Sequence, residues 1–233
     1  MTTLKKWDDL PEFMKCKEVK EYYDILNKKR VNILVKRMFD YILGVMFLIL
    51  LTIPMIIIAI LIKLDSPGPI FYRQERITQY GKKFKIHKFR TMVENADKIG
   101  DAVTVDNDVR ITKIGKKIRD YRLDEFPQIF DILSGNMSFV GTRPEAVKFV
   151  KEYDPEYFAT LLLPAGITSE ASIRFKDESK ILSEINDVDN TYVRKVLPRK
   201  MEYNLKSIED YSFIGDLMTM SRTVLAVIGK EYD

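Results

Sequence analysis

The dominant pattern of hydrophobic positions is an unbroken apolar run in the first third of the chain. No charged residue occurs between Tyr41 and Ile62, and about 20 apolar residues are enough for a helix to cross a bilayer. The run begins too far into the chain, is too long and lacks a small-residue cleavage site, so it is not a cleaved signal peptide. A buried core helix is the alternative, but a helix that is apolar on all sides is uncommon in a small soluble domain. The pattern therefore predicts a membrane helix.

The charges on either side of this run bear on its topology. Segment 28–37 carries only basic charges, and segment 63–90 carries eight basic residues against two acidic ones. Basic flanks favour the cytoplasmic side, and here both flanks are basic. Pro54 removes an intrahelical hydrogen bond, and the Thr52 hydroxyl can bond a carbonyl of the preceding turn, so we expect a bend here. A helical hairpin that leaves the membrane on the side it entered and a single span with a tolerated proline remain alternatives.

Shorter patterns predict that the rest of the chain mixes helices and strands, an α/β fold in the broad sense. More helix than strand is expected, which makes it a helix-rich α+β arrangement. Segments 70–74 and 84–89 have the composition of short strands around a turn at Gly81. Apolar residues at helical spacing predict helices over 110–123, from Asp124 to a stop at Gly135, and over 213–229. In the last helix the apolar face comprises Phe213, Leu217, Met220, Val224 and Ile228, and it is typical of a packed or interfacial helix rather than a second span.

Composition excludes several classes of protein. The chain is 46% hydrophobic and 31% charged, which is typical of a folded domain and not of a disordered chain. Cys16 is the only cysteine and His87 the only histidine, so an intramolecular disulfide framework and a multi-histidine or multi-cysteine metal site are excluded. We interpret His87 as a packed or surface residue. The net charge of +4 does not require nucleic acid as a partner.

An acidic pair, Asp124 and Glu125, lies between concentrations of basic residues. Segment 110–123 carries six basic residues against Asp120, and Arg143 follows in a turn of small residues. The pair falls at a predicted helix start, where a carboxylate can simply cap the helix. Alternatively, carboxylates beside guanidinium groups suit a metal-bound diphosphate, because the acids hold a divalent cation and the arginines bind phosphoryl oxygens. Both interpretations are open at this point.

Taken in order, several segments carry a resemblance to a known family. From Lys36 to the C-terminal helix, the chain resembles bacterial sugar transferases of the monotopic phosphoglycosyl transferase family. The resembling segments are Lys36–Asp40, the apolar run with Pro54, Pro67–Gln74, Lys88–Met92, Asn107–Thr112, Leu123–Gln128, Met137–Glu145 and Gly166–Thr168. Each is weak alone, and their common order makes the resemblance specific.

The resemblance implies a reaction, a location and partners. It implies transfer of a sugar-1-phosphate from a UDP-sugar to polyprenyl (undecaprenyl) phosphate, which gives polyprenyl-diphosphate-sugar and UMP as the first membrane step of glycoconjugate biosynthesis. Mg²⁺ is the implied cofactor, and membrane lipids at the cytoplasmic face of the bacterial inner membrane are the implied surroundings. The implied organisation is an N-terminal helical extension (1–35), a re-entrant membrane helix broken at Pro54 (36–63) and a catalytic domain (64–233). A homodimer is expected, although no residue specifies one.

The resemblance also assigns roles to individual residues. Asp124 would be the nucleophile that forms a phosphosugar-aspartate, and Glu125 would assist through the metal or through proton transfer. Both carboxylates would be metal ligands. Arg143 would bind phosphate, and Arg119, Lys88 and Arg90 would complete the anion-binding pocket.

Some positions depart from the family pattern, and one alternative function remains. The departures are Ile53 for a serine before Pro54, Thr142 for a proline beside Arg143, Asn136 for an aspartate, and Leu163–Glu170, which lacks an arginine and an aromatic residue. If these residues contact the nucleotide or sugar, the donor differs from that of typical members. The alternative is a non-catalytic membrane-surface module whose basic face binds anionic lipid while the acidic pair caps a helix. A nucleic-acid binder is disfavoured, because aromatic residues do not interleave the basic face.

Overall fold

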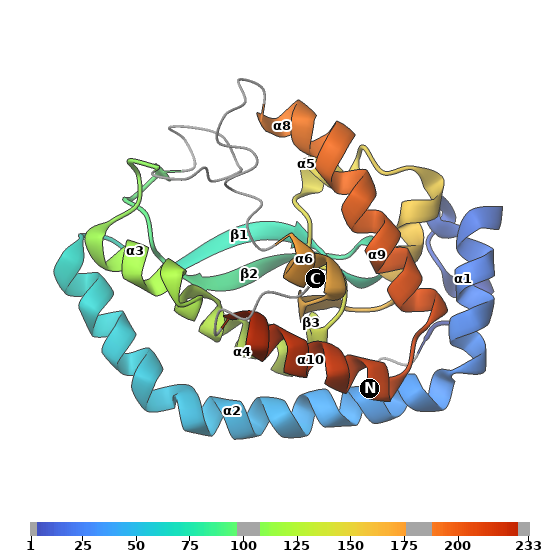
Figure 1. Ribbon diagram of the computed structural model, residues 1–233, viewed down its shortest axis with the longest axis horizontal. Coiled ribbons are helices and arrows are strands. Elements are labelled where there is room, and N and C mark those ends of the chain that lie inside the picture. The colour runs from blue at the N-terminus through green and yellow to red at the C-terminus, as the bar shows by residue number, and fades with distance from the viewer. Residues whose placement is uncertain (1–3, 97–107, 176–187, 228–233) are drawn as a thin grey trace.

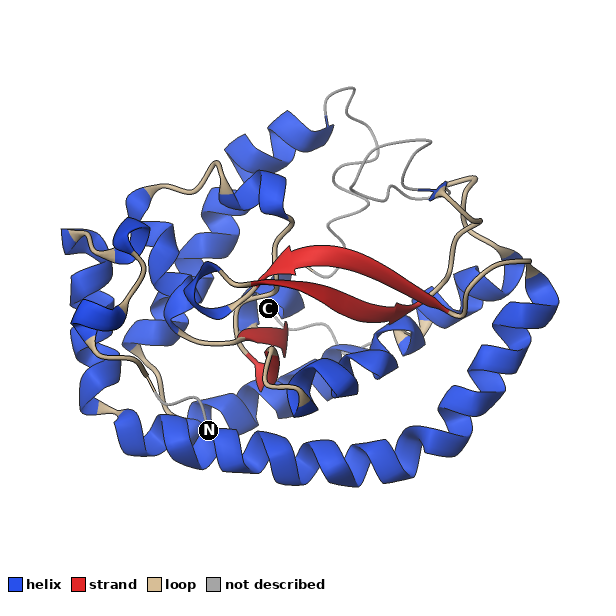
Figure 2. Ribbon diagram, turned by 180° about the vertical axis from the view of Figure 1, so that it is seen from behind, coloured by secondary structure: helices blue, strands red, loops and turns tan. Residues whose placement is uncertain are grey.

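The fold is a helix-rich α+β arrangement, as the sequence predicts. The computed structural model describes residues 4–96, 108–175 and 188–227. Within them, two small two-stranded sheets lie in the middle of the molecule, with the helices arranged around them (Figures 1 and 2). The regular elements are α1 Lys17–Lys28, α2 Arg30–Asp65, β1 Phe71–Ile77, β2 Lys83–Phe89, α3 Lys113–Asp120, η5 Leu123–Gln128, α4 Ile129–Leu133, β3 Met137–Val140, α5 Val147–Val150, η6 Pro155–Leu162, β4 Ala165–Thr168, α6 Glu170–Arg174, α8 Val188–Thr191, η7 Tyr192–Val196, α9 Leu197–Glu209 and α10 Phe213–Val227.

The apolar run forms helix α2, which lies along one edge of the molecule (Figure 1). The helix is long and apolar enough to cross a membrane, and most of its apolar side chains are exposed, Ile49 at 73% among them. It is a single helix that continues through Pro54 and bends, so the expected break is a bend. The Thr52 hydroxyl donates to the carbonyl of Leu48 at 2.6 Å, which is the back-bonding that favours bending.

Both ends of α2 are attached to the same folded body. Near the first end, the buried Arg37 guanidinium donates to the carbonyl of Met137 on β3 at 2.7 Å. At the other end, the carboxylate of Asp65 accepts a hydrogen bond from the backbone N–H of Ile114 at 3.0 Å. Ile62 is buried in the same region, in a cluster with residues of β2 and α3. The bent helix is therefore attached to the same domain near both of its ends.

The N-terminal extension is part of the domain core rather than a separate unit. Two short 3₁₀ turns, Trp7–Asp9 and Glu12–Met14, precede α1. Met14 and Leu26 are fully buried in one cluster with Leu162 of η6 and Leu205 of α9. Burial of this apolar surface fixes the extension against the C-terminal half of the chain.

The two sheets differ in topology. Strands β1 and β2 are antiparallel, and Tyr72 pairs with Lys88 in their register. They join through a turn at Gly81, whose φ of 74° favours glycine. Strands β3 and β4 are parallel. The strand predictions are confirmed, and β1 extends three residues beyond its predicted end.

The structure changes the bounds of one predicted helix and shows the packing of another. Helix α3 is shorter than predicted at both ends, because the Thr112 side chain caps its start and Arg122, with φ 53°, follows its end. In α10, Phe213 stacks edge-on against Phe39, while Leu217 and Val224 of the same predicted face are exposed. Ile228 lies outside the described residues.

Candidate active site

Three segments far apart in the sequence bring the predicted site residues together. Strand β2 carries Lys88, η5 carries Asp124 and Glu125, and the loop after β3 carries Arg143. The Glu125 carboxylate accepts hydrogen bonds from Arg143 Nη2 at 2.7 Å and Lys88 Nζ at 3.0 Å. Asp124 Oδ2 lies 3.7 Å from the same Lys88 Nζ. The geometry thus unites two carboxylates and two cations.

The local backbone places both carboxylates inside a turn and not at its cap. The left-handed Arg122 precedes η5, and no side chain caps this turn. Asp124 is the second residue of η5, and Pro127 fits a helical φ within it. The capping interpretation of the acidic pair is therefore wrong, because these side chains bind side-chain cations instead.

The two carboxylates have opposite electrostatic environments. Burial alone would raise the pKa of Glu125, but Arg143 and Lys88 lower it well below its ordinary value. Burial raises the pKa of Asp124, Lys88 opposes that rise, and the neighbouring Glu125 charge adds to it. The Glu125 carboxylate in turn raises the pKa of Arg143. Nearby cations more than offset the cost of burying the Glu125 charge, but they do not offset that cost for Asp124.

The Asp124 carboxylate keeps its oxygen lone pairs available. Within the part of the chain that the structure describes, it accepts no hydrogen bond, and the nearest cation, Lys88, is beyond hydrogen-bond distance. An ionised carboxylate with uncommitted oxygens can attack an electrophile or bind a metal ion. Glu125 has less capacity for either role, because one of its oxygens already accepts from two cations.

The remaining predicted pocket residues have different surroundings. The Arg119 charge on α3 lowers the pKa of Asp124, so Arg119 acts on the same site. The Arg90 guanidinium is buried and donates to the carbonyls of Ser66 and Pro67 at 2.7 and 2.6 Å. The structure does not bring Arg90 to the acidic pair. It stabilises the turn after α2, where both of its terminal nitrogens donate hydrogen bonds.

The donor set fits Mg²⁺ better than a transition metal. Asp124 and Glu125 offer hard carboxylate oxygens, and Mg²⁺ commonly binds through one or two carboxylates together with substrate phosphates. Among the described residues, no cluster of three or more histidine, cysteine, aspartate or glutamate side chains could hold a metal alone. A cation at this site would therefore take part of its coordination from a phosphate ligand or from water.

Sequence reasoning missed a buried polar cluster behind the site. Glu145, two residues after Arg143, accepts a hydrogen bond from the hydroxyl of Tyr192 at 2.6 Å. Lys200 Nζ lies 2.9 Å from that hydroxyl and 3.5 Å from the Glu145 carboxylate. Tyr192 and Lys200 are 47 or more positions from Glu145 in the sequence, so no local sequence pattern predicts that they contact it.

Comparison with known proteins decides the family. The family model described as bacterial sugar transferase matches residues 31–230. The chain belongs to the bacterial sugar transferase family. The match includes α2, the acidic pair and Arg143, and it confirms the resemblance drawn from the sequence motifs.

Two of the similar proteins are named as sugar-phosphate transferases and a third as an exopolysaccharide production protein. The chain is 32% identical over 197 residues to a UDP-N-acetylgalactosamine-undecaprenyl-phosphate N-acetylgalactosaminephosphotransferase of Aeromonas hydrophila, covering 83% of this chain and 44% of the relative. It is 36% identical over 200 residues to a UDP-glucose:undecaprenyl-phosphate glucose-1-phosphate transferase of Klebsiella pneumoniae, covering 83% and 40%. An exopolysaccharide production protein of Sinorhizobium fredii is 30% identical over 207 residues, covering 82% and 84%. This sugar transferase therefore spans less than half the length of the first two relatives and most of the third.

Proposed function

We propose that this bacterial sugar transferase moves a sugar-1-phosphate from a UDP-sugar to polyprenyl phosphate through a covalent intermediate on Asp124. The observation that carries the proposal is the difference between the two carboxylates. Glu125 accepts hydrogen bonds from two cations, whereas Asp124 is partly buried beside it with uncommitted oxygens. The names of the relatives support UDP-sugars as donors and undecaprenyl phosphate as the acceptor.

The cations around the pair would bind the donor diphosphate. A guanidinium matches phosphoryl oxygens with paired N–H donors, and Arg143 has one edge engaged by Glu125. Lys88 and Arg119 add positive charge on the side of Asp124. These charges would stabilise the negative charge that gathers on the leaving phosphate.

The proposed reaction has two displacements at one phosphorus. An Asp124 carboxylate oxygen attacks the sugar-bearing phosphorus of the donor, the bond to the bridging oxygen breaks, and UMP leaves with the electron pair. A phosphate oxygen of the polyprenyl acceptor then attacks the same phosphorus. The bond to Asp124 breaks, and the free carboxylate is restored. Because UMP leaves before the acceptor reacts, the scheme predicts ping-pong kinetics.

Mg²⁺ fits this scheme as the cofactor. Asp124 and Glu125 would hold the ion, with donor phosphates supplying further ligands. When bound, it would neutralise charge on the diphosphate and on the leaving UMP. Glu125 would contribute by keeping Lys88 and Arg143 in place at the phosphates.

The same proposal includes the placement at the membrane. We propose that α2 is re-entrant and enters and leaves at the cytoplasmic face. Both of its ends bond to the folded domain, at Met137 and at Ile114, and both flanks are basic. This arrangement would keep the site at headgroup height, where the acceptor phosphate resides, and proximity would replace a search through solution.

The test measures UMP release by the detergent-solubilised protein with Mg²⁺, polyprenyl phosphate and a panel of UDP-sugars. Asp124→Asn should abolish release, because an amide is not a nucleophile here, and Asp120→Asn, an exposed acid on α3, is the matched control. Release that depends on the lipid phosphate in the control but is lost in Asp124→Asn supports the proposal, and a phosphosugar adduct on Asp124 should be trapped without acceptor. Release that survives Asp124→Asn overturns the covalent scheme. Binding to anionic vesicles with no release from any donor would instead favour the lipid-binding module.

A further inference from the structure

Backbone hydrogen bonds and the buried side chain of Glu145 hold the loop that carries Arg143. On one side, the N–H of Gly141 donates to Thr168 O at 3.0 Å, and Thr142 O accepts from Gly166 N at 2.9 Å. After Arg143 and Pro144, the carbonyl of Glu145 accepts from Ile77 N at 3.1 Å. The Glu145 side chain points inward and is 7% exposed.

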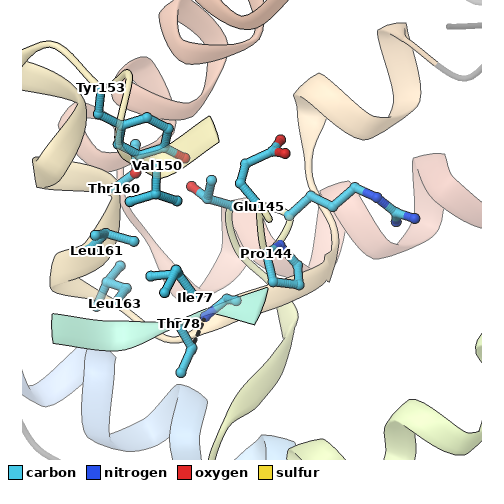
Figure 3. A pocket seen from close by; sticks show the side chains of 12 residues that line it. Ile77, Thr78, Pro144, Glu145, Val150, Tyr153, Thr160, Leu161 and Leu163 are labelled. Atoms are coloured by element: carbon cyan, nitrogen blue, oxygen red, sulfur yellow. Dashed lines mark hydrogen bonds between the residues drawn. The ribbon is translucent and has the colours of Figure 1, made fainter. Parts of the chain in front are cut away.

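Apolar packing behind this loop is incomplete. Figure 3 shows a small pocket there, with Val150, Leu161 and Leu163 lying across from Pro144 and Glu145. Close packing on this side would restrain the loop through many short contacts, and a gap forfeits some of them. The anchoring of the Glu145 side chain therefore adds to the backbone hydrogen bonds that hold the loop.

Two residues from the C-terminal helices anchor Glu145. The Tyr192 hydroxyl, at the start of η7, donates to its carboxylate at 2.6 Å, and Lys200 of α9 lies 3.5 Å away. Tyr192 and Lys200 are 2% and 5% exposed, so solvent does not screen this cluster. Burial would raise the pKa of Glu145, but Lys200 and the Tyr192 hydrogen bond lower it, so the carboxylate stays charged at neutral pH.

The same carboxylate also acts electrostatically on the site. Glu145 raises the pKa of Arg143 and counters the effect of burial on Arg76 of β1. If Glu145 lost its anchor, its charge could move toward Arg143 and compete with a bound phosphate. Holding Glu145 on Tyr192 and Lys200 prevents both this competition and a shift of the loop.

We infer that Tyr192 and Lys200 are positioning residues for nucleotide binding: they hold Glu145, and through it they fix the loop that presents Arg143 to the donor diphosphate. The inference rests on the proposed function for the identity of the ligand. It assigns a role at the site to the η7–α9 segment, whose contact with the site runs through Glu145 and not through Asp124 or Glu125.

The test uses the full chain in detergent and measures affinity for UDP by isothermal titration with Mg²⁺ present. Tyr192→Phe removes only the hydroxyl, and we expect it to weaken UDP binding about tenfold. Tyr211→Phe is the matched control, because its buried hydroxyl has no hydrogen-bond partner among the described residues, and it should bind UDP as the wild type does. Thermal unfolding of both variants checks that the fold is retained.

A double-mutant cycle separates positioning from a general structural role. If Tyr192 acts through Arg143, Tyr192→Phe should weaken UDP binding less than about twofold further in an Arg143→Ala background. Equal losses in both backgrounds, or unchanged affinity in Tyr192→Phe, would overturn the inference, as would a wild type that does not bind UDP. UDP binding with the expected coupling, but without lipid-dependent UMP release from any donor, would overturn the proposed function and leave this inference standing.

Discussion

At the scale of single residues, the two adjacent carboxylates of this site have different surroundings. Glu125 lies between Arg143 and Lys88, whereas Asp124 has only a longer contact with Lys88. Environments that push two pKa values apart are a recurrent way to assign different roles to like groups. The consequences can be measured without knowing the donor sugar.

Neutral replacements of the two carboxylates should change stability in opposite directions. The raised pKa of Asp124 means that its charge costs stability above that pKa, so Asp124→Asn should raise the melting temperature at pH 7.5. The lowered pKa of Glu125 means that its charge contributes stability above the ordinary glutamate pKa, so Glu125→Gln should cost about 1–2 kcal/mol, a figure discounted for the partial exposure of Arg143. Thermal unfolding at pH 7.5 checks both. Shifts of the same sign would contradict the assignment.

The acid side of the pH–activity profile should report on Asp124. Attack requires the ionised carboxylate, and burial raises its pKa, so kcat/KM should fall at a higher pH than an ordinary aspartate would dictate. Lys88 lowers the pKa of Asp124, so Lys88→Met should move this acid limb further upward in pH, in addition to any loss of rate. The measurement is kcat/KM for UMP release from pH 5 to 9. A limb that stays in place in Lys88→Met would show that another group controls it.

At the scale of elements, one buried ion pair joins α2 to α10. Lys36 Nζ of α2 lies 2.8 Å from the carboxylate of Asp216 on α10, and both side chains are largely buried. Lys36→Met leaves a buried, uncompensated carboxylate and should destabilise the protein by about 3 kcal/mol. Adding Asp216→Leu should recover most of that loss, because the pair is then replaced by apolar groups.

An exposed ion pair provides the control for this cycle. Lys83 and Glu75 lie 3.0 Å apart on the antiparallel sheet, but both are about half exposed. Lys83→Met should therefore change stability by less than about 1 kcal/mol. Thermal unfolding of these three variants beside the wild type completes the comparison. If the double variant were less stable than Lys36→Met alone, the pair would not be the link between α2 and α10.

Local patterns predicted the elements well where the decisive interactions are local. Strands β1 and β2, the turn at Gly81 and the extent of α10 follow from alternation, turn chemistry and helical spacing, whereas β3 and β4 were not predicted. The end of α3 was not predicted because Arg122 takes a left-handed conformation that few non-glycine residues adopt. Helix α2 continues through Pro54 and bends, because one missing hydrogen bond bends a long apolar helix without interrupting it.

At the scale of the whole molecule, long-range contacts limit what the sequence can predict. Motif resemblance grouped Lys88, Asp124, Glu125 and Arg143, and the structure brings these four together. It also grouped Arg90, whose guanidinium instead bonds the turn after α2. The contact between Glu145 and Tyr192 joins segments with no shared motif, and only the folded chain reveals it.

The bent α2 makes a prediction about the position of the whole molecule in the membrane. A straight helix of 36 residues would be about 54 Å long and would carry its ends to opposite sides of a bilayer. Here Arg37 and Asp65, one toward each end, bond to the same domain, so crossing would require one of these contacts to break. We therefore expect both ends of α2 to face the cytoplasm.

Cysteine labelling tests this topology. Single cysteines at Val31 and Leu64, which are 74% and 80% exposed near the two ends of α2, are placed in a Cys16→Ser background. Both should react with a membrane-impermeant maleimide in inside-out vesicles and neither in right-side-out vesicles. Ile53→Cys, exposed in the structure but at the bend, should stay unlabelled in either until detergent is added, because the acyl chains would shield it. Labelling of the two ends from opposite sides would establish a single span, and it would require the contact of Met137 or of Ile114 with α2 to be absent in the membrane.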